Sequence, residues 1–163
     1  VTTYSGLFNV YRLEHNMGLA KALNNGILQC KNEIIVRMDS DDVSMPDRVE
    51  KQMKAMKEKN VASNGLLFDT CKHMREIRDN YFRSYHLPGI VIDSFVYHNI
   101  ADWHWLREGE QSSNQPIGTY EKRLYDSCPV WSFNLTAPGS NMPVDTYKYI
   151  DVLIKVLKYM TEE

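Results

Sequence analysis

The chain has few of the features that would place it in a membrane, on a nucleic acid or outside the cell. No run of residues approaches the about eighteen apolar positions that a membrane-spanning helix needs, and the first residues lack the pattern of a secretory signal peptide. Lys and Arg number 19 against 21 Asp and Glu, so the net charge is only -2 and gives no electrostatic reason to expect a nucleic acid or a membrane surface as partner. We therefore expect a cytoplasmic protein with no membrane span in this chain.

Cysteine is also scarce. Cys30, Cys71 and Cys128 are odd in number and widely spaced, which disfavours both a disulfide framework and a zinc cluster. We expect all three to be buried thiols. With 163 residues, of which 43% are hydrophobic, the chain is long enough to bury a core for one domain or two small lobes.

The acidic segment at residues 37–42 follows the apolar run at residues 34–36, and it bears most directly on function. Side chains alternate along an extended backbone, so Asp39 and Asp41 point to one face while Asp42 begins the next turn. Mg²⁺ or Mn²⁺ takes one or two protein carboxylates and keeps its other positions for water or phosphate oxygens. The pattern therefore indicates a metal and a nucleotide diphosphate at the carboxyl end of a strand. The alternative is structural, because Asp and Ser also form Asx-turns and cap helices.

The elements around this segment predict an α/β fold. Residues 7–13 have the character of a short strand, and residues 34–36 that of a buried strand. Between them, apolar residues at a three-and-four spacing predict a helix that packs one face inward and ends near Cys30; these residues are Leu19, Ala20, Leu23 and Ile27. Another helix is expected from Pro46 to about Lys59. The resulting βαβα order is typical of parallel α/β sheets.

Three motifs in this region resemble those of the family 2 glycosyltransferases of the GT-A fold. They are Asn-x-Gly-Leu-Ala-x-Ala-Leu-Asn-x-Gly-Ile from residue 16, Arg-Met-Asp-x-Asp-Asp from residue 37, and Pro-x-Arg-x-x-x-Gln from residue 46. The resemblance covers about residues 5–59. It implies hexosyl transfer from a UDP- or GDP-sugar to an acceptor that the sequence does not identify.

The resemblance also implies roles for particular residues. Asp39 would lie near the ribose, while Asp41 and Asp42 would hold Mg²⁺ or Mn²⁺, which bridges the diphosphate. The other donor-binding residues that it suggests are Asn16, Gly18, Asn24, Arg37 and Arg48.

The chain departs from the family pattern at both ends of this region. The first strand of such a domain and its second acidic strand end do not precede Val1, and no counterpart of a catalytic base is found after residue 60. We therefore expect a donor half-site that is weakly active or inactive alone. A sheet edge left open by missing strands would favour a homodimer.

Residues 61–163 are expected to form a second, mostly helical region. An apolar stripe predicts a helix within residues 64–82, and further helices are expected at residues 88–106, 120–127 and 145–160. Residues 109–118 are predicted to form a loop, and residues 129–143 an irregular segment.

Three segments of this region resemble, more weakly, the helical C-terminal part of bacterial cGAS-like and oligoadenylate-synthase-like nucleotidyltransferases. They are residues 68–75, 87–97 and 135–141. The alternative function is accordingly a helical nucleotide-binding lobe, although the Gly-Ser turn of those enzymes does not precede Asp39. If both resemblances hold, the chain is a fusion with a seam near residues 59–64. A third interpretation is a truncated, non-catalytic fusion.

Overall fold

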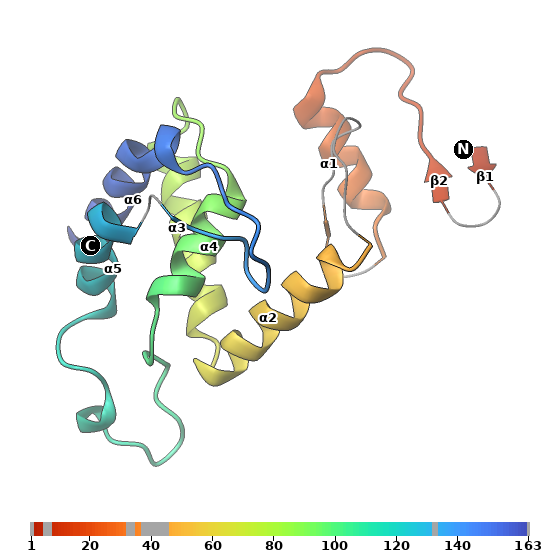
Figure 1. Cartoon of the computed structure of the whole chain (residues 1–163). Coiled ribbons are helices and arrows are strands. Elements are labelled where there is room, and N and C mark those ends of the chain that lie inside the picture. The colour runs from red at the N-terminus through yellow and green to blue at the C-terminus, as the bar shows by residue number, and fades with distance from the viewer. Residues whose placement is uncertain (1, 5–7, 32–34, 37–45, 132–133, 163) are drawn as a thin grey trace. The chain divides into compact units, whose positions relative to one another are not determined.

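The computed structural model describes residues 2–4, 8–31, 35–36, 46–131 and 134–162 (Figure 1). The chain divides into two compact units, Val1–Ser44 and Met45–Glu163. The sequence predicts a boundary near residue 60, whereas this division falls before helix α2 (Arg48–Ala62), which therefore belongs to the second unit.

The described residues of the first unit form two short strands and one helix. Strand β1 (Thr2–Tyr4) pairs antiparallel with β2 (Phe8–Val10), and helix α1 (Leu19–Gln29) follows. Helix α1 ends one residue before Cys30, which confirms the predicted helix. The parallel βαβα arrangement is not confirmed, because the described sheet has two antiparallel strands and the described residues Ile35 and Val36 lie in no strand.

Helix α1 keeps its apolar side chains largely in contact with solvent. The sequence predicts that they pack inward, but Leu19 and Ile27 are 64% and 49% exposed, and α1 has no buried residue. The pattern therefore predicted the helix but not its surroundings, since within the described part of this unit no second layer covers its apolar face.

The described part of the second unit is a bundle of five helices. Helix α2 is followed by α3 (Leu66–Tyr81), α4 (Gly89–Asn99), α5 (Tyr120–Trp131) and α6 (Ile150–Glu162), with short 3-10 turns at Ser112–Asn114 and Tyr147–Tyr149. Helix α6 packs on α5 and α3, and α4 packs between α3 and α5 (Figure 1). The core is made by fully buried apolar side chains from these helices, including Leu67, Met74, Phe95, Leu124, Leu153 and Leu157.

The apolar stripe of α3 is confirmed in its first three turns. Leu66, Leu67, Met74 and Ile77 are buried, whereas Tyr81, at the last position of the stripe, is 59% exposed. Burial of such side chains supplies most of the driving force for folding this unit. Among the described residues, no helix has both the length and the apolar character required to cross a membrane.

Helix α4 is shorter than the sequence predicts, because tertiary contacts redirect the chain after Asn99. Ala101 adopts a left-handed conformation, with φ at 51°, and its carbonyl accepts a hydrogen bond from Nζ of Lys59 at 3.0 Å. The carbonyl of Trp105 accepts another from Nδ2 of Asn64 at 3.0 Å. The last turn of α2 and the turn that follows it thus hold this segment in an irregular path. Helix α5, in contrast, runs to residue 131, beyond its predicted end at residue 127.

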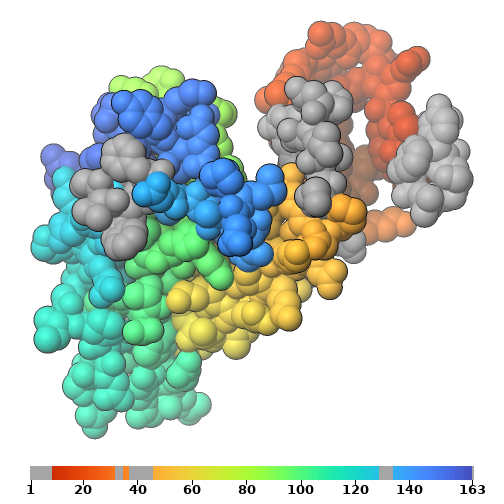
Figure 2. Space-filling view, viewed as in Figure 1, coloured from red at the N-terminus to blue at the C-terminus, as the bar shows by residue number. Residues whose placement is uncertain are grey.

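The segment after α5 returns across the bundle. An isolated antiparallel bridge joins Thr136 and Pro143, and Figure 2 shows this segment, in light blue, lying against α2 in orange and yellow. The closest approach is at Gly139, where an added Cβ atom would lie 2.5 Å from the carbonyl oxygen of Lys51. The region predicted to be irregular therefore has a defined packing partner.

Candidate functional site

The structure describes four of the eight predicted site residues. Asn16 and Gly18 lie together in the turn before α1, Asn24 lies in the middle of α1, and Arg48 is the first residue of α2. The other four, which are Arg37, Asp39, Asp41 and Asp42, lie outside the described residues.

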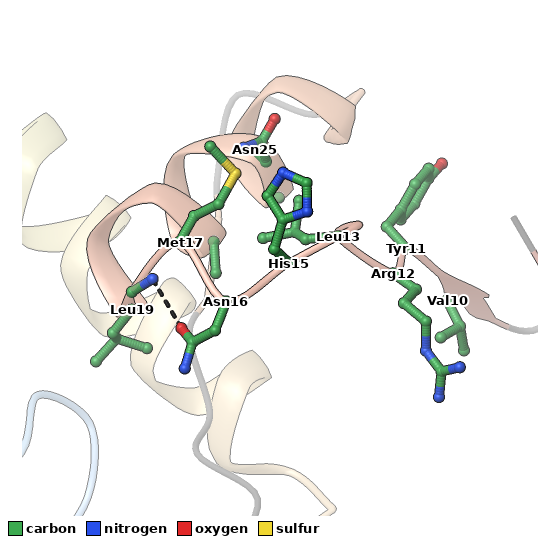
Figure 3. Close-up of a pocket in the computed structure, with 12 residues that line it drawn as sticks. Val10, Tyr11, Arg12, Leu13, His15, Asn16, Met17, Leu19 and Asn25 are labelled. Atoms are coloured by element: carbon green, nitrogen blue, oxygen red, sulfur yellow. Dashed lines mark hydrogen bonds between the residues drawn. The ribbon is translucent and has the colours of Figure 1, made fainter.

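Asn16 and Gly18 have a clear local role, which is to start helix α1. The backbone N–H of Gly18 donates a hydrogen bond to Oδ1 of Asn16 at 2.9 Å, closing an Asx-turn (Figure 3). The carbonyl of Gly18 then accepts the first helical hydrogen bond from the N–H of Ala22 at 3.1 Å. Gly18 has φ 79° and ψ 160°, a conformation that is essentially restricted to glycine. The motif therefore fixes where the helix begins.

A cavity of about 830 Å³ lies beside this turn. Figure 3 shows it between the chain that leaves β2 and the first half of α1. It is lined by residues 10–13 and 15–19 together with Ala22, Asn25 and Gly26. Asn24 is not among these residues, while its neighbour Asn25 is; the side-chain amide of Asn25 donates to the carbonyl of Lys21 at 3.0 Å.

The lining of this cavity is mainly apolar, and the charged side chain among its described residues is cationic. Arg12 supplies a positive charge and His15 a titratable ring, and the described lining residues include no carboxylate, because Glu14 is not one of them. The N-terminus of α1 adds backbone N–H groups without intrahelical partners and the positive end of the helix dipole. A phosphate or diphosphate is the kind of ligand that such an arrangement binds.

Sequence reasoning did not single out Arg12 and His15. The available signal was their position directly before the Asn-x-Gly motif, at the point where the strand leads into the helix. Arg12 and His15 form no motif that would indicate a binding site. They are identified as lining residues by the way the turn packs against α1.

Arg48 and Gln52 lie one turn apart on α2, where both side chains are partly buried. This confirms the helical spacing expected from their motif. Among the described residues, no group of three or more His, Cys, Asp or Glu side chains is arranged to hold a metal ion.

Comparison with known proteins gives a family match over most of the chain. The model of glycosyl transferase family 2 matches residues 1–130. This match extends past residue 59, where the motif resemblance ends, and through much of the region that resembles the nucleotidyltransferases.

Curated relatives agree with this match. The chain is 39% identical over 149 residues to the amylovoran biosynthesis glycosyltransferase AmsE of Erwinia amylovora, covering 88% of this chain and 52% of AmsE. It is 53% identical over 47 residues to the O-antigen biosynthesis glycosyltransferase WbnJ of Escherichia coli, covering 29% of this chain and 18% of WbnJ.

A further relative is the UDP-Gal:alpha-D-GlcNAc-diphosphoundecaprenol beta-1,3-galactosyltransferase of Escherichia coli, which is 48% identical over 40 residues, 24% of this chain and 14% of that protein. The chain thus spans about half the length of AmsE and smaller shares of the other two. No solved structure matches the chain.

Proposed function

Because the chain belongs to glycosyl transferase family 2, we propose that it provides the donor-binding part of an enzyme that transfers a hexose from a nucleotide-diphosphate sugar. The observation that carries this proposal is the acidic segment at residues 37–42, which lies inside the family match and follows the Asn-x-Gly helix. The donor is a UDP- or GDP-sugar. Since AmsE and WbnJ are named for amylovoran and O-antigen biosynthesis, we infer that the acceptor is a saccharide.

The residues of the acidic segment fit a divalent metal by their chemistry. Asp41 and Asp42 carry hard carboxylate oxygens, which are the ligands that Mg²⁺ and Mn²⁺ prefer. When bound, such an ion offsets the negative charge that develops on the leaving diphosphate. In this proposal Asp39 binds the ribose, and Arg37 and Arg48 attract the diphosphate electrostatically.

The cavity beside α1 supports the same proposal. Its cationic and helix-terminal groups suit phosphate oxygens, and its described lining includes no carboxylate that would repel them. Asn16 and Gly18 act by fixing the start of α1, because their own hydrogen bond is made within the turn. Asn24 is assigned to the donor site by the family motif alone.

Calorimetric titration with UDP, GDP and ATP, each with and without Mn²⁺, tests the proposal. We expect Mn²⁺-dependent binding that weakens by about tenfold or more in Asp41→Ala, because a metal ligand is lost. Asp145→Ala is the matched control, since Asp145 is an exposed aspartate paired with Lys148 at 3.3 Å in the second unit. Binding of ATP that is indifferent to Mn²⁺ and to Asp41 would overturn the proposal and favour a nucleotidyltransferase lobe.

A further inference from the structure

A second cavity, of about 350 Å³, lies within the helical unit, where the end of α4 meets α5 and the segment that follows it. Its polar lining comes from His98 and Asn99 on α4, Arg123 and Ser127 on α5, and Asn134. Ala101 and Leu135 complete the wall. Its described lining residues all belong to the second unit, whereas those of the cavity beside α1 belong to the first. Its size is at the lower end of the range for small-molecule sites.

The charge of this cavity is positive. Arg123 is the charged side chain among its described lining residues, which include no carboxylate. Within the described part of the chain, no ion pair engages the guanidinium of Arg123. Its neighbour Lys122, in contrast, lies 3.0 Å from the carboxylate of Asp126. Arg123 therefore has its charge and its hydrogen-bond donors available for a ligand.

The wall contributed by α4 is held in place by its own hydrogen bonds. Nε2 of His98 lies 2.9 Å from the carbonyl oxygen of Thr136 and 3.2 Å from Oγ1 of the same residue, so two contacts hold the imidazole ring in place. Nδ2 of Asn99 donates to the carbonyl of Phe95 at 2.9 Å, and Asn99 is 8% exposed. Neither side chain needs to reorganise when a ligand enters, which lowers the cost of binding.

We propose that this cavity binds a phosphate-bearing group, with Arg123 as its charge partner and Ser127 and Asn134 as hydrogen-bond donors. A guanidinium matches two phosphate oxygens at once, whereas hydroxyl and amide groups supply single donors. The inference deepens the proposed function and rests on it in one respect, which is that the group belongs to a substrate of sugar transfer. The phosphate can come from the acceptor or from the donor.

The first test is a titration of the full chain with inorganic pyrophosphate in metal-free buffer, in which the backbone amide resonances are monitored by NMR. We expect shifts in residues 98–101 and 123–127 and a Kd that rises by about tenfold in Arg123→Gln. Lys122→Gln is the matched control, because it removes the same charge one position away on the same helix, and we expect its Kd to change by less than about twofold. Both variants should unfold at the temperature of the unmodified chain, since both side chains are exposed.

A second titration identifies the source of the phosphate, with glucose 1-phosphate and with UDP plus Mn²⁺ as probes. If Arg123→Gln weakens binding of glucose 1-phosphate alone, the cavity binds the phosphate of the acceptor. If the substitution weakens binding of UDP, the cavity binds the phosphate of the donor. Asp41→Ala should leave metal-free pyrophosphate binding unchanged, so that failure of the donor site and failure of this cavity are distinguishable. The proposal is overturned if pyrophosphate causes no shifts around Arg123, or if the two charge variants have equal effects.

Discussion

Nε2 of His104 lies 2.8 Å from the carboxylate of Glu110, and this contact closes the segment between α4 and α5. Nδ1 of the same ring lies 2.9 Å from the carbonyl oxygen of Asp102, and the other carboxylate oxygen of Glu110 accepts from the N–H of Arg107 at 3.0 Å. When the ring is protonated, both of its nitrogens donate, so that the charged form satisfies every contact.

These contacts predict a pH dependence of stability. The Asp102 carbonyl, and then Glu110, raise the pKa of His104 above 6.5. The contribution of protonated His104 to stability is therefore complete below pH 6.5 and is lost as pH rises through the raised pKa. The Arg107 N–H, and then His104, lower the pKa of Glu110 below 4.5. The contribution of ionised Glu110 to stability is therefore present above pH 4.5 and is lost as pH falls through the lowered pKa. The pair therefore stabilises most between pH 4.5 and 6.5.

Thermal unfolding of Glu110→Gln from pH 4 to pH 9 checks this prediction. The decrease in Tm relative to the unmodified chain should be largest between pH 4.5 and 6.5 and should shrink above it. Glu108→Gln in the same segment, where the side chain is exposed, is the control and should show no such maximum. If Tm changed with pH in the same way in both variants, the contact between His104 and Glu110 would contribute nothing to stability.

Gly139→Ala should destabilise the helical unit. Gly139 has φ at +68°, and the added Cβ would lie 2.5 Å from the carbonyl oxygen of Lys51 and 2.8 Å from Cβ of Ala55. Backbone strain and overpacking together predict a loss of about 2 to 4 kcal/mol in the free energy of unfolding. Urea denaturation measures this loss.

Gly109→Ala separates the two causes. Gly109 has φ at +78° but no atom within 4 Å of the added Cβ, so strain alone applies and the expected loss is about 1 kcal/mol. Equal losses in the two variants would contradict the packing of the segment at Gly139 against α2.

The cysteines should differ in their reaction with a thiol reagent. Cys30 is exposed, while Cys71 and Cys128 are 2% and 0% exposed, and burial raises the pKa of the Cys71 thiol. One thiol should therefore react at once in the native chain and three after denaturation, because the thiolate is the reactive form. Cys30→Ser should remove the rapid phase. Rapid reaction of two or more thiols in the native chain would contradict the described core.

The sequence predicted elements whose signals are local. The apolar spacing from Leu19 to Ile27 predicted helix α1 and its end near Cys30, and the stripe of α3 predicted most of its buried face. The expectation of three buried thiols was wrong for Cys30, because the number and separation of the cysteines do not show where each thiol lies.

Features set by distant contacts were not predictable in this way. The end of α4 depends on Lys59 and Asn64, some forty residues earlier in the chain, which bind the carbonyls of Ala101 and Trp105. The two cavities depend on how a turn or a returning segment packs against a helix, so sequence patterns did not identify Arg12 and Arg123 as lining residues. The metal-binding role of Asp41 and Asp42 stays a prediction from the motif, since these residues lie outside the described part of the structure.

The proposal that residues 37–42 hold a metal and a nucleotide diphosphate is tested most directly by electron paramagnetic resonance of Mn²⁺ in the presence of UDP. The unmodified chain and Asp145→Ala should lower the free Mn²⁺ signal below the level that UDP alone produces, whereas Asp41→Ala should not. Binding of Mn²⁺ by Asp41→Ala as strong as in the unmodified chain would contradict the account.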